Sequence, residues 1–151
     1  MATKLAAAVT FAAALTAAPA LAQDTYATLE EAQAMAERAA AYLLEVGPEE
    51  AYEAFTFSEE WRDRDLYVFV IDNEGVNRAQ GADPDRVGTP EWDLTDANGV
   101  LIVQEMLAVD DTGWVDYIWP NPVTGVEEPK RSYIVRVDDV IVGVGAYLAA
   151  G

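Results

Sequence analysis

DYIWPNPVTGVEEPKRSY, residues 116–133, joins a strand pattern to a turn and a single cation. Tyr117 and Trp119 stand two residues apart, so a β-strand would place both rings on one face of a sheet. Two prolines, an asparagine and a glycine at residues 120–125 predict a turn. Lys130 follows, and it is the only lysine outside the first ten residues. Two aromatic rings beside one rare cation favour a small-ligand pocket over an ordinary hairpin.

Strand patterns continue on both sides of this hairpin. The run LYVFVID at residues 66–72 is dense in β-formers, and a short turn leads to a return strand at residues 76–80. Three further strands are expected over residues 114–119, 131–137 and 140–148. These strands are joined by short links, except where a helical pattern intervenes. Short links favour antiparallel neighbours.

Three helical patterns accompany the strands. Apolar residues recur at helical spacing over residues 28–46, where Thr28 and Glu31 form a capping box. Pro48 begins a shorter helix, and an amphipathic pattern predicts a third helix over residues 98–109. The resulting order predicts an α+β domain, a five-stranded antiparallel sheet with a long N-terminal helix and other helices packed on it.

The N-terminal residues have the pattern of a targeting signal. Lys4 supplies a positive start, residues 5–18 are an apolar run, and the A-x-A sequence at residues 20–22 is a cleavage site. We therefore predict a signal peptide at residues 1–22 and a single domain at residues 23–151. With no cysteine for a lipid anchor and no later apolar span, the product is expected to be periplasmic.

The charge of the chain excludes several classes of partner. Residues 1–22 hold one of the nine basic residues and none of the 27 acidic ones, so the remaining chain carries a net charge of about −19. Such a surface repels phosphate backbones and anionic lipids, so neither nucleic acid nor a membrane surface is expected as a partner. The absence of cysteine means that packing alone must hold the fold.

Residue types needed for most catalytic sites are missing. The sequence has no histidine and no cysteine, which removes the usual general base, thiol nucleophile and zinc ligands. Asp96, Asn98 and Glu105 match three positions of a calcium-binding loop, but its first position falls on Leu94, which cannot bind a metal. An Asx turn or helix cap at Asp96 is therefore favoured. We predict no enzyme activity, no metal and no cofactor.

The runs YVFVIDNEGVNRAQGADPDRVG, DLTDANGVLIVQEM and GWVDYIWPNPVTGVEEPKRSYIVRVDDVIVGVGAY together resemble a single Cache domain of bacterial extracytoplasmic sensors. The resemblance covers residues 28–148 and is most specific in the block that ends in Lys130, Ser132 and Tyr133. It implies a PAS-like antiparallel sheet and a pocket between the sheet and its covering loops. It also implies a small organic ligand, often a short carboxylate, and a role in sensing by chemoreceptors and histidine kinases.

This chain departs from the family pattern at two points. The family often has a histidine in an AHG-like run, whereas Gln80 stands there in this chain and cannot be charged. The sequence also shows no second membrane span and no signalling domain. We therefore expect a free-standing chemotaxis or signal-transduction sensor that acts through a membrane sensor kinase, chemoreceptor or transporter.

These observations predict recognition of a small organic ligand without turnover. Tyr117 and Trp119 would form an apolar wall, Lys130 would meet a carboxylate, and Gln80 would orient the polar end. The predicted ligand-binding residues are Tyr67, Gln80, Trp92, Tyr117, Trp119, Lys130 and Tyr133. Three alternatives remain open: a surface ion pair of Lys130 with Glu127 or Glu128, a protein-interaction module with a filled pocket, and a carboxylate-based hydrolase.

Overall fold

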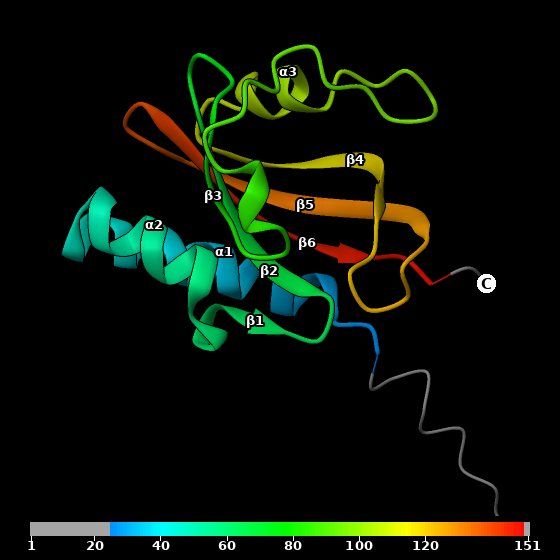
Figure 1. Ribbon diagram of the computed structural model, residues 1–151, viewed down its shortest axis with the longest axis horizontal. Helices are drawn as coiled ribbons and strands as arrows, with labels where there is room; N and C mark the ends of the chain where they lie inside the picture. Colours follow the sequence, from blue (N-terminus) through cyan, green and yellow to red (C-terminus); the bar gives the residue numbers. More distant parts are fainter. Residues whose placement is uncertain (1–24, 150–151) are drawn as a thin grey trace, which may run out of the picture.

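A computed structural model describes residues 25–149, arranged as a twisted sheet with helices on one side and loops on the other (Figure 1). The predicted signal peptide at residues 1–22 lies outside the described residues. Within residues 25–149, no helix has both the length and the apolar character needed to cross a membrane.

The order of elements follows the predicted order closely. The helices are α1 (Leu29–Val46), α2 (Pro48–Phe57) and α3 (Ile102–Leu107), with 3-10 turns η1 (Glu59–Trp61) and η2 (Pro84–Arg86). The strands are β1 (Arg62–Asp63), β2 (Leu66–Asp72), β3 (Asn77–Gln80), β4 (Thr112–Pro120), β5 (Glu127–Val137) and β6 (Val140–Tyr147).

The sheet is antiparallel throughout, with strand order β1-β2-β6-β5-β4 and with β3 paired to β2. The five predicted strands are confirmed. The sixth strand, β1, has only two residues and lies between α2 and β2. Two residues are too few for an alternating pattern to be recognised in the sequence.

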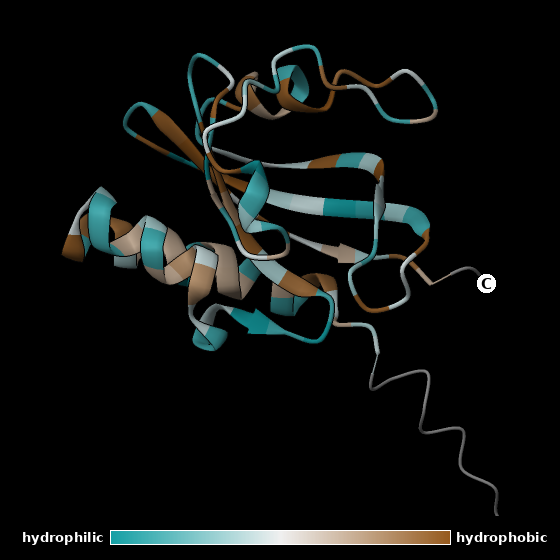
Figure 2. Ribbon diagram, in the orientation of Figure 1, coloured by the Kyte–Doolittle hydropathy of each residue, from teal (hydrophilic) through white to brown (hydrophobic). Residues whose placement is uncertain are grey.

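The capping box of α1 is present as predicted. The side chain of Thr28 accepts a hydrogen bond from the backbone N–H of Glu31, and the Glu31 carboxylate accepts one from the backbone N–H of Thr28. Gly47, with φ of 86°, ends α1, and Pro48 begins α2 at a position where proline costs no helical hydrogen bond. Both helices carry hydrophilic as well as hydrophobic residues (Figure 2) and bury their apolar side against the sheet.

Side chains alternate along the strands and divide the interior into two cores. The core under α1 and α2, here called the helix-covered face, includes Leu66, Val68, Val70, Val142 and Val144. The core under α3 and its flanking loops, here called the loop-covered face, includes Tyr67, Phe69, Ile71, Tyr117, Ile134, Ile141 and Tyr147. Figure 1 shows the two sets of covering elements on opposite sides of the sheet.

The glycines of β6 leave room on the loop-covered face. A Cβ atom at Gly143 would collide with the ring of Phe69, and one at Gly145 would collide with Ser132 and lie 2.6 Å from Cε of Lys130. Glycines inside a strand generally indicate a bulge or a close approach by another group. The pairing of β6 is regular on both sides, so there is no bulge, and the close approach is made by neighbouring side chains.

The third helix is shorter than its sequence pattern predicts. The side chain of Asp96 accepts hydrogen bonds from the backbone N–H groups of Asn98 and Val100, and Gly99 has φ of 78°. The left-handed backbone at Gly99 and the bridge between Thr95 and Leu101 are incompatible with a helix over residues 98–101, so α3 begins only at Ile102.

Asp65 ties the start of α1 to the end of β6. Its fully buried carboxylate accepts hydrogen bonds from the backbone N–H of Ala27 at 2.7 Å and of Tyr147 at 3.3 Å. Burial raises the pKa of Asp65, and these backbone donors oppose that shift. The two ends of the described chain are therefore joined next to Tyr147, an aromatic residue of the loop-covered face.

Candidate functional site

The loop-covered face encloses a small pocket of about 30 Å³. Its apolar walls come from β2, β4 and α3, and its polar groups come from β3 and the loop after it. The lining residues are Tyr67, Phe69, Ile71, Asn77, Gln80, Glu91, Met106, Tyr117 and Trp119. A single water needs roughly 10–15 Å³ of this kind of volume, so the pocket has room for about two waters or one very small organic molecule.

Lys130 lies next to this pocket and is 99% buried, being only 1% exposed. Its Nζ atom donates a hydrogen bond to the hydroxyl of Tyr67 at 2.8 Å. Four aromatic rings surround the ammonium within cation–π range. The distances from Nζ to the ring centroids are 4.1 Å for Tyr67, 5.0 Å for Tyr147, 5.5 Å for Phe69 and 5.8 Å for Tyr117.

The register of the sheet builds this aromatic cage. Lys130 on β5 stands directly opposite Tyr117 on β4 and Tyr147 on β6. Directly opposed residues of antiparallel strands point to the same face, so all three side chains meet on the loop-covered face. Tyr67 and Phe69 join them from β2, the strand paired with β6 on its other side.

The cage holds a positive charge that no carboxylate neutralises. Within residues 25–149, no carboxylate oxygen lies within ion-pair distance of Lys130. Burial is the largest influence on the pKa of Lys130 and lowers it, and the contacts with Tyr117 and Tyr67 oppose that shift. Burial also raises the pKa of Tyr117 and Tyr147. At neutral pH Lys130 is therefore a buried cation beside the neutral phenols of Tyr117 and Tyr147.

The alternative of a surface ion pair for Lys130 does not match this arrangement. Glu128 instead accepts hydrogen bonds from Tyr26, Asn121 and Thr124. Lys130 also lines an adjacent hollow of about 290 Å³, and Tyr117 lines both hollows.

The predicted ligand-binding residues fall into two groups. The structure brings Tyr67, Gln80, Tyr117 and Trp119 together around the pocket, with Lys130 beside it. Tyr117 and Trp119 share a face as predicted, with ring centroids 6.3 Å apart. Gln80 is 6% exposed, and its Oε1 accepts a hydrogen bond from the backbone N–H of Ala82.

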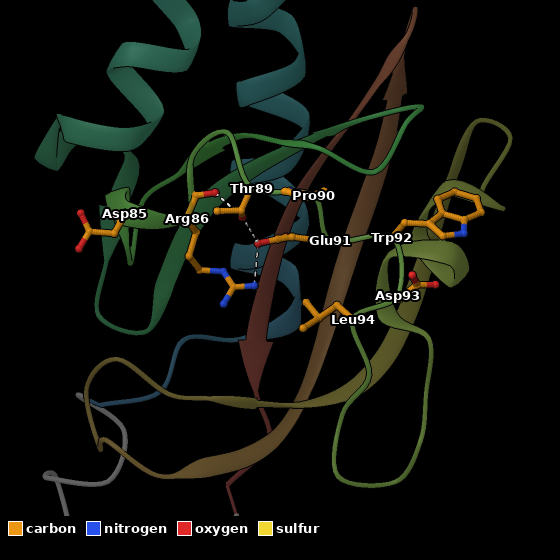
Figure 3. Close-up of a pocket in the computed structure, with 8 residues that line it drawn as sticks. All are labelled: Asp85, Arg86, Thr89, Pro90, Glu91, Trp92, Asp93 and Leu94. Carbon is orange, nitrogen blue, oxygen red and sulfur yellow. Dashed lines mark hydrogen bonds and ion pairs between the residues drawn. The ribbon is translucent and has the colours of Figure 1, made fainter.

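Tyr133 and Trp92 lie apart from this group. Tyr133 belongs to the helix-covered face, because it is one residue out of phase with Lys130 and Ser132 on β5. The centroid of its ring lies 4.9 Å from that of Trp114. Trp92 is 45% exposed and lines a separate, outward-facing hollow of about 540 Å³. Figure 3 shows its ring directed away from Arg86 and Glu91.

A buried polar network that the sequence interpretation missed closes the pocket at the loop after β3. The Glu91 carboxylate pairs with Arg86 at 2.6 Å and accepts from the hydroxyl of Thr89 at 3.2 Å (Figure 3). Its other oxygen accepts from the amide Nδ2 of Asn77 at 3.4 Å. The guanidinium of Arg86 stacks on Trp119, 4.8 Å from the ring centroid. Nothing in the sequence spacing brings these residues together, because the loop fold determines their positions.

The candidate calcium loop forms the predicted Asx turn. Besides closing that turn, Asp96 accepts the backbone N–H of Ile118 at 2.9 Å, which is the first cause of its lowered pKa. Among residues 25–149, no three acidic side chains are grouped closely enough to hold a metal ion.

Comparisons with known proteins agree with this fold. The sequence pattern of the family described as Single Cache domain 2 matches residues 3–150. The chain belongs to this family. Cache domains are extracytoplasmic sensors of chemoreceptors and histidine kinases, and this Cache domain is homologous to such sensors. The α+β fold predicted from the order of helices and strands and the resemblance to a single Cache domain are both confirmed.

One curated relative is a sensor histidine kinase, MctS, from Rhizobium johnstonii (strain DSM 114642 / LMG 32736 / 3841). The two chains are 35% identical over 89 residues, which is 56% of this chain. The match covers only 19% of the length of the kinase. The similarity therefore concerns about a fifth of the kinase and says nothing about its other parts.

Solved structures show the same fold. A methyl-accepting chemotaxis protein from Vibrio parahaemolyticus RIMD 2210633 is 22% identical, with a TM-score of 0.67 over 80% of this chain and 88% of the other. A periplasmic sensor domain of a chemotaxis protein is 28% identical, with a TM-score of 0.61 over 79% and 89%. A Cache chemosensory domain described for carboxylic acid recognition is 20% identical, with a TM-score of 0.70 over 79% and 92%.

Proposed function

We propose that this Cache domain is a periplasmic sensor that binds a short carboxylate anion and releases it unchanged. The observation that carries the proposal is the buried ammonium of Lys130 without a carboxylate partner. An unneutralised buried cation is costly, and a nearby anion offsets that cost. The ligand would supply this anion.

The hydrogen-bond directions indicate how the carboxylate is held. Lys130 donates to the oxygen of Tyr67, and Tyr147 donates its own hydroxyl proton to the carbonyl of Pro120, so the Tyr67 proton is directed at the Tyr147 oxygen 3.4 Å away. A carboxylate in the pocket would replace Tyr147 as the acceptor of this long hydrogen bond. Donation from an ammonium polarises that hydroxyl and strengthens its own hydrogen bond. The Tyr67 hydroxyl would thus donate a hydrogen bond, strengthened by the charge of Lys130, to the carboxylate. Tyr117 and Trp119 would contact the carbon atoms of the ligand.

The size of the pocket limits the ligand. A volume of about 30 Å³ has room for about two waters or one very small molecule, so it restricts the ligand to the smallest carboxylates unless the covering loop moves. The acidic surface does not prevent anion binding, because charges further than a Debye length of about 8 Å are screened at physiological salt.

The proposed output is protein contact rather than chemistry. Ligand binding would be reported to a sensor kinase, a chemoreceptor or a transporter in the membrane, in keeping with the roles of the homologous sensors. The Asp65 connection between Tyr147 and Ala27 offers a direct mechanical link from the cage to the start of α1.

Thermal-shift and calorimetric titration with acetate and propionate test the proposal. We expect both anions to raise the melting temperature of ligand-free protein. At a ligand concentration of a hundred times Kd, the stabilisation should be about 2.7 kcal/mol. Lys130→Met removes the charge but keeps the length of the side chain. It should weaken binding by about 10- to 150-fold, the equivalent of one charged hydrogen bond.

Arg131→Gln is the matched control, since Arg131 is the next residue, lies on the opposite face and pairs with Asp116 at the surface. It should leave affinity unchanged. If no short carboxylate stabilises the ligand-free protein, the proposal is wrong and a docking module with a self-filled pocket becomes the better hypothesis. Equal affinity of Lys130→Met and wild type would remove the cation from the site.

A further inference from the structure

We infer that the pocket has a second recognition point, made by Asn77 and Glu91, which binds a hydroxyl group of the ligand. The ligand class then becomes the short hydroxy acids rather than the plain carboxylates. This inference rests on the proposed function, because it assumes that a carboxylate occupies the pocket.

Unsatisfied buried atoms point to this second recognition point. Within residues 25–149, two buried side-chain polar atoms have no hydrogen-bond partner: Oδ1 of Asn77 and Nε of Arg86. Both belong to the network around Glu91. Asn77 lines the pocket and is only 1% exposed, so water outside the protein does not reach its free oxygen. Such atoms are rare in folded proteins because leaving them unpaired is costly.

The orientation of the Asn77 amide is fixed by its neighbour. Nδ2 donates to the Glu91 carboxylate at 3.4 Å. Rotating the amide by half a turn would bring Oδ1 against a negatively charged oxygen, which is unfavourable. Oδ1 is therefore the free atom, and it can only accept a hydrogen bond. The ligand must bring a donor to it.

Charge at this end of the pocket favours a neutral donor over an ammonium group. The Glu91 carboxylate is already neutralised by Arg86 at 2.6 Å, and the same oxygen accepts from Thr89. A ligand ammonium would bring three donors and a full charge to a place with one free acceptor and no net negative charge. A hydroxyl brings one donor and fits the small volume.

The arrangement predicts how the two recognition points share one small molecule. The carboxylate would lie at the end next to Tyr67, and the hydroxyl would point toward Asn77. Removing the hydroxyl would leave Oδ1 unpaired in the bound state, so the site should discriminate against the plain acid. Each hydroxy acid should bind about tenfold or more tightly than its plain counterpart.

Isothermal titration of ligand-free protein with matched pairs tests this inference. Glycolate is compared with acetate, and lactate with propionate, so that each pair differs by one hydroxyl group. The same pairs are then measured for Asn77→Leu, in which the free acceptor is replaced by an apolar group of similar volume. We expect the preference for the hydroxy acid to disappear while binding of the plain acid is kept.

Gln104→Leu is the matched control, because its amide donates to the backbone of Trp92 and does not line the pocket. It should keep the wild-type preference. If Asn77→Leu does not fold, as judged by circular dichroism, Asn77→Ser serves in its place, since its shorter side chain holds its oxygen further from the ligand. It should lose the preference in the same way.

The possible outcomes separate the two proposals. Equal binding of hydroxy and plain acids by the wild type would overturn the hydroxyl site and leave the carboxylate sensor intact. Failure of all four anions to bind would overturn both. Tighter binding of glycine or alanine than of glycolate or lactate would also overturn the hydroxyl site, because it would show that an ammonium group is recognised.

Discussion

The two faces of the sheet are built from the same strands but differ in packing and in polarity. On the helix-covered face, β6 presents Val142 and Val144, both fully buried against an alanine-rich α1. On the loop-covered face, the same strand presents Gly143 and Gly145, and the space is taken by aromatic rings and Lys130. One face is a dry apolar core, whereas the other keeps a cavity and a buried charge.

This difference indicates that close packing is sacrificed on the loop-covered face, where a ligand would be recognised. Cavities and unneutralised charges lower stability, so a core that keeps them is expected to serve binding. The helix-covered face supplies the rigidity that holds the cage in register. Substitutions on the loop-covered face should therefore separate stability from ligand affinity, and the following predictions test this in order of expected effect.

Gly143→Ala should have the largest effect on stability. The new methyl group would enter the space of the Phe69 ring, which would have to move toward the pocket. Overpacking of this kind costs about 1–3 kcal/mol in the free energy of unfolding. Urea unfolding measures this cost, and titration with acetate should show weaker binding because Phe69 is part of the cage.

Gly113→Ala is the control for that substitution. A Cβ atom at Gly113 would meet only the methyl groups of Val109, at an ordinary 3.5 Å. Its stability should change by no more than about 0.5 kcal/mol, as for typical surface changes. Equal losses for the two variants would show that the glycines of β6 do not serve to make room for the cage.

The helices, the strands and one face of the site could be predicted from sequence because they depend on local periodicity. Alternation along residues 116–133 placed Tyr117 and Trp119 on one face, and the capping box located the start of α1. The third helix was predicted too long because its apolar pattern continues into an Asx turn at Asp96. Periodicity describes where side chains point and does not show the left-handed backbone at Gly99 that excludes a helix there.

The contents of the cage and of the network depend on register and loop conformation, which periodicity does not give. Tyr147 faces Lys130 only because β5 and β6 pair in one particular register. Asn77 and Glu91 meet because the loop between them folds back through the bridge of Val76 with Pro90. Tyr133 shows the reverse case, since its place in the aromatic block suggested a role in the pocket although its phase on β5 assigns it to the other face.

Lys130→Met should change stability less than Gly143→Ala does, and in the opposite direction. Without ligand, the ammonium of Lys130 has no carboxylate partner, so an apolar side chain of similar length removes a desolvation cost. We expect the free energy of unfolding to stay the same or to rise by about 1–2 kcal/mol in carboxylate-free buffer, measured by urea unfolding. A loss of more than about 2 kcal/mol would show that the charge supports the fold rather than the ligand.

Polar groups outside the pocket should contribute a little to stability and nothing to ligand affinity. The ion pair between Asp72 and Arg78 tests this, and its expected effect is the smallest. Its oxygen and nitrogen are 2.7 Å apart, and the Arg78 side chain is 46% exposed. Arg78→Gln should lower the free energy of unfolding by about 0.2–1 kcal/mol at neutral pH and leave carboxylate affinity unchanged.

The pH dependence of that loss identifies its cause. Burial alone raises the pKa of Asp72, but the backbone N–H of Val76 and the charge of Arg78 outweigh it, and the pKa is lowered from its usual 3.8. A lowered pKa contributes stability above the unfolded value, and this contribution is lost as the pH falls through the folded value. The difference between Arg78→Gln and wild type should therefore be constant from neutral pH down to about 4 and disappear below it. A difference that grows on acidification, or a change in acetate affinity, would show that polar groups outside the pocket are coupled to the loop-covered face after all.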